Sequence, residues 1–314
     1  MKNVLIVVII VLLLAGGSAF YFFNKSSDET YTKDPEETNT NIPEDNVNVV
    51  EETPIDILEP TENNNQNRGP ETIIGKSVAG NDIKAYHFGQ GENEILFVGG
   101  IHGGYSWNTA LVAFEMIDWL KDNPNAIPEN VTVTVIPVLN PDGLEKVTGT
   151  TGKFSASQVS SQNRTEGRFN ANNVDLNRNF DCEWQPVGTW QDREVSGGKT
   201  AFSEPESKAI RDYVNNYNPV AAVTWYSAAG GVYASSCRNG ISSDTLALTN
   251  LYAKASGYQA FEEFDYYEIT GDMVNWFASK NIPAISVLLT THEQTEWTKN
   301  KAGIEAVIKH YANN

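Results

Sequence analysis

The feature that most constrains the fold is an alternation, after residue 70, between short apolar segments and segments with helical periodicity. Residues 95–98 form an apolar run that ends in two glycines, and residues 107–120 then carry apolar side chains at helical spacing. Further strands are expected at 131–139, 220–225 and 284–289, and further helices at 243–255, 272–279 and 295–311. This alternation predicts an α/β domain with a mostly parallel or mixed sheet that helices cover on both faces.

Two local signals refine this expectation. Ser203 is a favourable N-cap with Glu206 at the capping-box position, so a helix is predicted to begin there. The Asn-Pro-Asp-Gly segment 140–143 predicts a turn after the preceding strand. Because ligands bind outside the carboxyl ends of strands in such sheets, the residues that follow each strand are the candidates for a functional site.

The loop after the first of these strands contains His102 among glycines. A histidine in this position, between a strand and a helix, suits a metal ligand, because the glycines let the backbone come close and the helix start can hold a second ligand. The alternative is a histidine that is hydrogen-bonded within a turn.

A second polar loop, 168–181, contains Arg168, Arg178 and several amide side chains. Arginine suits a bidentate grip on a carboxylate. The alternative is a hydrogen-bonded loop in which the arginines pair with Asp175 and Asp181.

Several motifs together resemble those of one enzyme family. They occur in this order: GIHGG at 100–104, PVLNPDG at 137–143, VDLNRNF at 174–180, FSEPE at 202–206, TGD at 270–272 and IPAISV at 282–287. Each motif is weak alone, but the six in register look like the M14 zinc carboxypeptidases. The resemblance extends from about Glu71 to the C-terminus.

The resemblance implies a three-layer α/β sandwich around a mixed, mostly parallel eight-stranded sheet. It also implies hydrolysis of a peptide bond next to a free C-terminal carboxylate. In the family, one zinc held by His, Glu and His activates water, and a separate Glu is the general base. An Asn-Arg pair grips the substrate carboxylate, a second Arg steadies the oxyanion, and a mobile Tyr closes the site.

The metal and base positions of this sequence depart from that pattern. His102 matches the first zinc ligand, but Tyr105 or Ser106 stands where the glutamate ligand is expected. Tyr226 stands in place of the second histidine, and Leu288 in place of the general base. A catalytic zinc needs three protein ligands, so zinc is expected to be absent or weakly bound.

The substrate-binding positions are kept. Asn177 and Arg178 match the carboxylate grip, Arg168 matches the oxyanion arginine, and Tyr267 matches the mobile tyrosine. We therefore expect a pseudoenzyme that still binds the C-terminal carboxylate of a peptide or of a peptidoglycan stem peptide.

Two other functions stay open. One is an active zinc carboxypeptidase with an unusual metal site, for which a shifted set of His102, His292 and Glu293 is the available donor set. The other is a non-catalytic scaffold whose acidic linker, or another surface, binds a partner.

The N-terminal segment predicts export. Residues 4–23 carry no charge and are long enough to cross a bilayer, and Lys2 precedes them. We expect residues 1–24 to be a signal-anchor with the following domain outside the cell membrane. The alternative is a cleaved signal peptide, which makes the domain secreted.

Residues 25–70 are expected to be a disordered linker. They contain 12 acidic and three basic residues and almost no core-forming side chains. The folded domain is placed at 71–314. The net charge of -18 argues against nucleic-acid binding, since phosphates are repelled.

The sequence contains two cysteines, Cys182 and Cys237. In an exported protein such a pair is more often a disulfide than a redox or metal site. We predict that they pair, and the alternative is two buried free thiols.

Overall fold

The computed structural model describes residues 68–162 and 164–313. The predicted signal-anchor at 1–24, with its membrane segment 4–23, lies outside the described residues, as does nearly all of the predicted linker. Within the described ranges, no helix has the length and apolarity that a membrane span requires.

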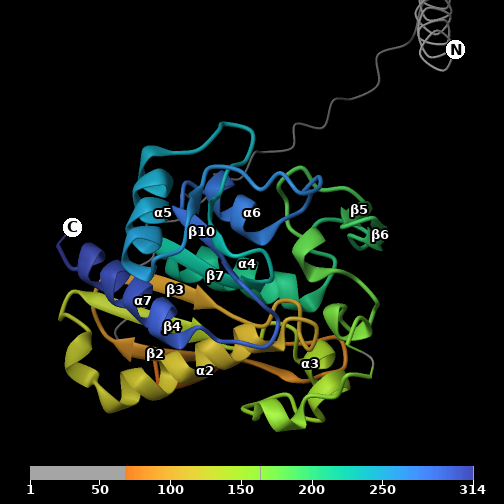
Figure 1. The fold of residues 1–314 in the computed structure, drawn as a ribbon, viewed down its shortest axis with the longest axis horizontal. Coiled ribbons are helices and arrows are strands. Elements are labelled where there is room, and N and C mark those ends of the chain that lie inside the picture. Colours follow the sequence, from red (N-terminus) through yellow and green to blue (C-terminus); the bar gives the residue numbers. More distant parts are fainter. Residues whose placement is uncertain (1–67, 163, 314) are drawn as a thin grey trace, which may run out of the picture. The chain divides into compact units, whose positions relative to one another are not determined.

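One eight-stranded sheet organises the described domain (Figure 1). Its spatial order is β1-β2-β4-β3-β7-β10-β8-β9. The strands are β1 Glu71–Lys76, β2 Asp82–Gly89, β3 Asn93–Val98, β4 Val131–Ile136, β7 Ala221–Ser227, β8 Gly231–Ala234, β9 Ala260–Phe261 and β10 Ala284–Leu289. The strand pairs β3·β4, β3·β7, β7·β10 and β8·β9 are parallel, and the other three are antiparallel.

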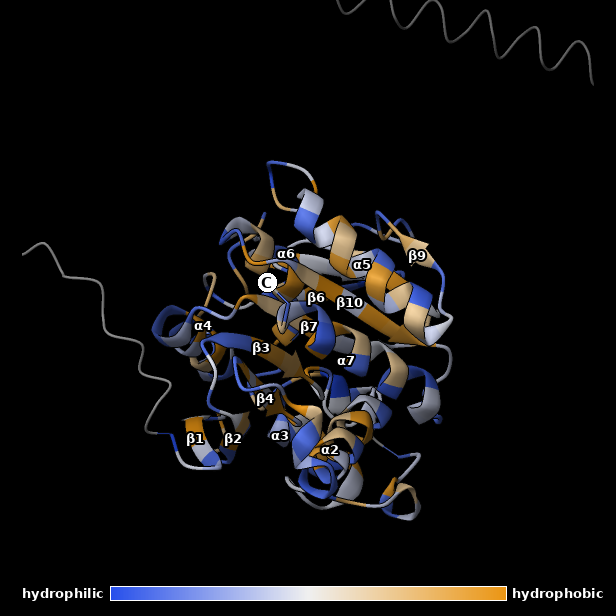
Figure 2. Cartoon of the chain, turned by 90° about the vertical axis from the view of Figure 1, so that its left-hand side faces the viewer, coloured by the Kyte–Doolittle hydropathy of each residue, from blue (hydrophilic) through white to orange (hydrophobic). Residues whose placement is uncertain are grey.

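Helices cover both faces of this sheet. They are α2 Trp107–Asp122, α3 Pro141–Thr148, α4 Pro205–Tyr217, α5 Ser243–Ser256, α6 Met273–Ser279 and α7 Trp297–Tyr311. One apolar core joins α2, α5 and α7 to the sheet, and a second core on the other face joins α4 and α6 to it. The central strands β3 and β10 are strongly apolar because both of their faces are buried (Figure 2). The predicted three-layer α/β sandwich with a mixed sheet is confirmed.

Smaller elements complete the domain. A separate hairpin pairs β5 Val187–Trp190 with β6 Arg193–Ser196. Among the described residues, four short 3₁₀ helices occur at η2 Pro124–Ala126, η3 Ala156–Gln158, η4 Glu166–Arg168 and η5 Leu176–Arg178. The last two carry the arginines of the second polar loop.

Two local predictions were wrong. The segment 140–143 is the first turn of helix α3, which Asn140 caps by accepting a hydrogen bond from Gly143 N at 2.8 Å. The N-cap of α4 is Glu204 rather than Ser203, and no side-chain capping bond forms. Pro205 explains the shift, because proline fits the first helical position, where an N–H is not needed.

The strand ends place the candidate residues at one edge of the sheet. Strands β3, β4, β7 and β10 run parallel, so their carboxyl ends lie on the same side. His102 follows β3, Tyr226 is near the end of β7, and Leu288 is its direct partner on β10. Residues that are far apart in the sequence therefore meet at this edge.

Candidate functional site

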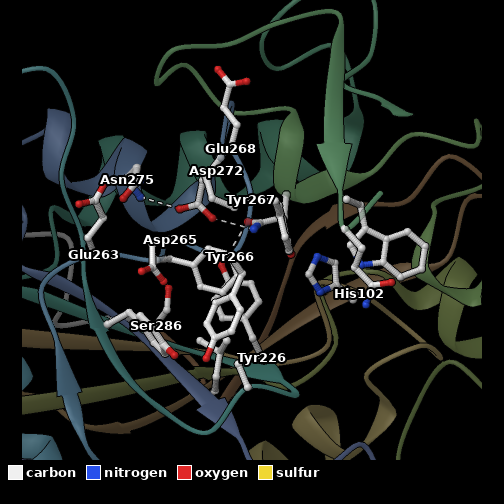
Figure 3. Close-up of a pocket in the computed structure, with 18 of the residues that line it drawn as sticks. His102, Tyr226, Glu263, Asp265, Tyr266, Tyr267, Glu268, Asp272, Asn275 and Ser286 are labelled. Carbon is white, nitrogen blue, oxygen red and sulfur yellow. Dashed lines mark hydrogen bonds between the residues drawn. The ribbon is translucent and has the colours of Figure 1, made fainter. Parts of the chain in front are cut away.

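A cleft of about 1060 Å³ lies at this edge. His102, Tyr226 and Leu288 line it from the strand ends, and residues 262–269 form another wall. Figure 3 shows Tyr226, Tyr266 and Tyr267 between His102 on one side and the acidic Glu263 and Asp265 on the other.

His102 is 5% exposed at the base of the cleft. Its Nε2 lies 3.6 Å from Asp175 Oδ1, which is beyond hydrogen-bond distance. Within the described part of the chain neither ring nitrogen has a hydrogen-bond partner. Burial and the charge of Arg168 lower the pKa of His102 to about 4, so the ring is neutral at pH 7.

Tyr226 occupies the position of the second histidine ligand but cannot take over its role as a zinc ligand. Its hydroxyl donates to Asn177 Oδ1 at 3.1 Å. Burial, reinforced by the negative charge of Asp272, raises the pKa of Tyr226 well above 10, so the phenol stays neutral. A neutral phenol that already donates a hydrogen bond is a poor zinc ligand.

The position expected for the glutamate ligand is also unsuitable. Tyr105 lines the cleft, whereas Ser106 is the N-cap of α2, is 1% exposed and is not part of the lining. Leu288 contributes an apolar surface where the family has its base. The residues at these positions do not fit zinc, and no group of three metal-binding side chains occurs among residues 68–162 and 164–313.

The shifted donor set does not assemble either. His292 lines the cleft and meets Tyr105 in an edge-to-face contact, with the two ring centroids 4.7 Å apart. Glu293 is exposed and forms an ion pair with Arg164 at 3.2 Å. It is not among the residues that line the cleft with His292.

Arg178 is 1% exposed and lines the cleft. Its Nε and Nη2 donate to Thr189 O at 3.2 and 2.6 Å, and its Nη1 donates to Asn177 O at 2.7 Å. These bonds use three of its five N–H groups. No described carboxylate lies within 4.0 Å of the guanidinium. A buried cation is therefore held by neutral carbonyl groups.

Asn177 is held by its neighbours rather than left free for a ligand. Its Nδ2 donates to Asp272 Oδ2 at 2.7 Å, and its Oδ1 accepts from both Tyr226 and Met273 N. The amide therefore fixes the backbone that leads into Arg178. Of the expected Asn-Arg pair, Arg178 is the member whose charge has no direct ion-pair partner among the described residues.

Arg168 pairs with Asp175, as the alternative interpretation of its loop predicts, and it also lines the cleft. Its Nε and Nη2 lie 2.9 and 2.8 Å from Asp175 Oδ2. Burial alone raises the pKa of Asp175, but the charge of Arg168 holds it well below its usual range. The guanidinium also lies 4.4 Å from the Trp190 ring centroid.

Tyr267 lies where the mobile tyrosine is expected, in the wall of the cleft. Its ring centroid is 5.9 Å from Arg178 Cζ and 5.0 Å from the ring of Phe264. Burial raises the pKa of Tyr267, so its hydroxyl is a neutral donor at pH 7. Tyr267 and Arg178 together face one part of the cleft.

A disulfide joins Cys182 to Cys237, with a Cα–Cα distance of 6.0 Å. It links the segment after Arg178 to the segment after β8. Gly271 N also donates to Cys182 O at 2.8 Å. The segments that follow Arg178 and β8 are thus covalently tied to each other.

Sequence reasoning assigned no role in the cleft to Asp272, Trp190 or Ser227. Asp272 lay inside a quoted motif, and its N-cap position was a usable signal, because its Oδ1 accepts from Asn275 N at 2.8 Å. Trp190 and Ser227 carried no sequence signal, since each meets its partners only through the fold.

Comparisons with known proteins give relatives by sequence and by fold. By sequence, a carboxypeptidase B of Helicoverpa zea is 28% identical over 151 residues, which cover 47% of this chain and 35% of that protein. A gamma-D-glutamyl-L-diamino acid endopeptidase of Lysinibacillus sphaericus is 23% identical over 217 residues, 62% of this chain and 54% of that protein. The match thus spans less than two thirds of each relative.

Solved structures share the fold. A bovine thrombin-activatable fibrinolysis inhibitor matches with a TM-score of 0.60 at 19% identity, over 77% of this chain and 88% of that chain. A murein-tripeptide amidase from Escherichia coli O157 matches with a TM-score of 0.51 at 17% identity, over 78% and 91%. The profile of Peptidase_M14, zinc carboxypeptidase, matches residues 57–311. This chain therefore belongs to the M14 zinc carboxypeptidase family.

Proposed function

We propose that this domain binds the free C-terminal carboxylate of a peptide and does not hydrolyse the peptide. The observation that carries the proposal is Arg178, whose guanidinium is almost fully buried beside the cleft. A buried charge is costly unless a partner of opposite charge compensates for it. The charges of Asp272 and Asp175 act on Arg178 from beyond 4.0 Å, but no described carboxylate forms a direct ion pair with it, and a ligand carboxylate supplies that direct partner.

We propose the absence of hydrolysis because the residues at the family's zinc-ligand and general-base positions cannot perform those roles. The positions of the family's zinc ligands hold one neutral imidazole, a neutral phenol at Tyr226, and Tyr105 or Ser106. Leu288 has no atom that accepts a proton from water. Activation of water and general-base catalysis act on the same chemical step, so losing both suppresses turnover.

The proposed ligand is a peptide outside the cell. Residues 4–23 and the acidic segment 25–70 support an exported domain tethered to the cell membrane, or secreted if the first segment is cleaved. One solved structure with this fold is a murein-tripeptide amidase, and one relative is named a gamma-D-glutamyl-L-diamino acid endopeptidase. We therefore extend the proposal to peptidoglycan stem peptides and the C-termini of exported proteins.

The binding experiment uses isothermal titration calorimetry with a panel of N-acetylated tripeptides. The panel has the form acetyl-Ala-Ala-X, where X is each common amino acid or D-alanine, as free acid and as C-terminal amide. We expect the free acids to bind and the amides to lose that binding. Arg178→Ala should weaken the free acids by about 10- to 100-fold, the worth of a charge-assisted hydrogen bond.

Arg211→Ala is the matched control. It removes a half-buried arginine of α4 that pairs with the neighbouring Asp212 and does not line the cleft, and it should leave peptide affinity unchanged. Equal affinity of wild type and Arg178→Ala for the free acids contradicts the proposal, and it favours a scaffold whose ligand binds elsewhere.

Family membership supports a second candidate, an active zinc carboxypeptidase with an unusual metal site. Zinc content is measured by mass spectrometry after chelation and re-addition of zinc, and release of X from the same peptides is followed by chromatography. Stoichiometric zinc together with turnover establishes this second candidate and overturns the first.

A further inference from the structure

A chain of hydrogen bonds connects the start of helix α2 to His292 in the cleft. Asn108 is completely buried, and its Nδ2 donates to Thr291 O at 2.7 Å and to Gln294 O at 2.9 Å. Both amide hydrogens are therefore used, and the orientation of the amide is fixed. Asn108 Oδ1 faces Ser227 Oγ at 3.0 Å, and Ser227 Oγ in turn lies 3.1 Å from His292 Nδ1.

This chain determines which nitrogen of His292 carries the proton. Asn108 Oδ1 is only an acceptor, so the single hydrogen of Ser227 Oγ must point toward it. Ser227 Oγ is then the acceptor for His292, and Nδ1 carries the hydrogen between them. If Ser227 donated to His292 instead, two oxygen lone pairs would face each other at 3.0 Å in a partly buried site.

As a consequence, Nε2 of His292 carries no hydrogen and is a hydrogen-bond acceptor. In a neutral imidazole only one nitrogen carries hydrogen, and here that nitrogen is Nδ1. Burial, with the nearby charge of Arg164, lowers the pKa of His292, which agrees with a neutral ring. Among the described residues, Nε2 has no hydrogen-bond partner, and His292 lines the same cleft as Arg178.

We propose that His292 is a second recognition residue, whose bare Nε2 accepts a hydrogen bond from a backbone amide N–H of the peptide that Arg178 holds by its carboxylate. The inference rests on the proposed function. The ligand then needs two features in one molecule, a free carboxylate and an amide N–H within reach of His292. Ser227 is a positioning residue, because it fixes the tautomer of His292.

The side chain beside His292 supports this role. Tyr105 meets the imidazole in an edge-to-face contact, with an angle of 67° between the ring planes. Tyr105 is itself packed against Trp190 at a centroid distance of 4.9 Å. The imidazole is thus held by a hydrogen bond at one nitrogen and by an aromatic contact, while the other nitrogen stays available.

The test is a cycle that combines protein variants with N-methylated peptides. The probe is the tightest-binding free acid of the acetyl-Ala-Ala-X panel, together with three forms that carry a methyl group on one amide nitrogen each. His292→Phe keeps an aromatic ring against Tyr105 but removes the acceptor. His292→Gln restores an acceptor oxygen at about the position of Nε2.

We expect His292→Phe to weaken the parent peptide about 3- to 10-fold, the worth of one hydrogen bond. One N-methylated peptide should be weakened by a similar factor on wild type, with no further loss on His292→Phe. His292→Gln should recover most of the affinity. Circular dichroism and the melting temperature check that each variant is folded.

Two results overturn the inference, and they are distinguishable. If Arg178→Ala abolishes binding but no methylated peptide shows coupling to His292, the second contact is wrong and the proposed function stands. If Arg178→Ala has no effect on any free acid, the proposed function fails, and this inference fails with it.

Discussion

Glu206 gives a prediction that is independent of any ligand. Its carboxylate is completely buried at the start of α4, where it accepts hydrogen bonds from Val78 N at 3.1 Å and from Asn170 Nδ2 at 3.2 Å. Burial raises the pKa of Glu206 from 4.5 to about 7, and these bonds offset the rise only in part. Ionised Glu206 is therefore a cost to the folded state.

The magnitude follows from proton linkage. Between pH 4.5 and 7 the unfolded chain loses this proton while the folded chain keeps it, so stability falls as pH rises through that window. Each tenfold change in proton affinity is worth about 1.4 kcal/mol, so the full penalty above pH 7 is about 3 kcal/mol. Glu206→Gln removes the penalty but disturbs one hydrogen bond, worth about 1 kcal/mol. The net gain at pH 8 is about 2 kcal/mol.

The assay is urea denaturation of wild type and Glu206→Gln at pH 5 and pH 8, followed by circular dichroism. We expect a gain of about 2 kcal/mol at pH 8, or about 4–8 °C in Tm for a domain of this size, and less than about 1 kcal/mol at pH 5. Glu129→Gln, at an exposed position, is the control and should leave the free energy of unfolding unchanged at both pH values. A gain of the same size at both pH values, or a loss at pH 8, refutes the reasoning.

Two further predictions concern the cleft. The triple variant Tyr105→Glu, Tyr226→His and Leu288→Glu should retain about one zinc per chain after dialysis, as measured by mass spectrometry. The first two changes complete a three-ligand set with His102, and the third restores the base. Equal zinc retention by wild type contradicts the conclusion that its residues do not hold zinc. Replacing both cysteines by alanine should lower the free energy of unfolding by about 2–4 kcal/mol, since the disulfide closes a loop with a sequence separation of 55. An unchanged denaturation midpoint under non-reducing conditions speaks against this.

Much of the central sheet was predictable, whereas its margins were not. Strands β3 and β10 are buried on both faces, so they stand out as continuous apolar runs. Strand β2 alternates buried Ile83 and Ala85 with more exposed neighbours, but its polar and small residues weaken that signal. The four residues of β8 and the two of β9 are too few for any periodicity, and sheet pairing alone defines them.

In the site, too, some features were predictable from the sequence and others were not. His102 after β3, Tyr226 in β7 and Leu288 in β10 were identified from the family motifs, which the sequence carries in order. The choice between the two interpretations of Arg168 needed the fold, because both a substrate carboxylate and Asp175 suit an arginine. The ion pair at 2.8 Å shows that Arg168 pairs with Asp175, whereas its contact with a substrate stays a prediction. The chain from Asn108 through Ser227 to His292 joins three distant segments, which no local pattern reveals.

Tyr226 connects the proposed loss of hydrolysis to the proposed retention of binding. Its hydroxyl donates to Asn177 Oδ1, and Asn177 in turn is tied to Asp272 and precedes Arg178. Tyr226→His alone removes this bond, worth about 1 kcal/mol, yet supplies only a second zinc ligand beside His102. Such a variant has a less ordered carboxylate site and still no catalytic metal. In our proposal, the residue that replaces a zinc ligand therefore also stabilises the carboxylate site, so the two changes are coupled through one side chain.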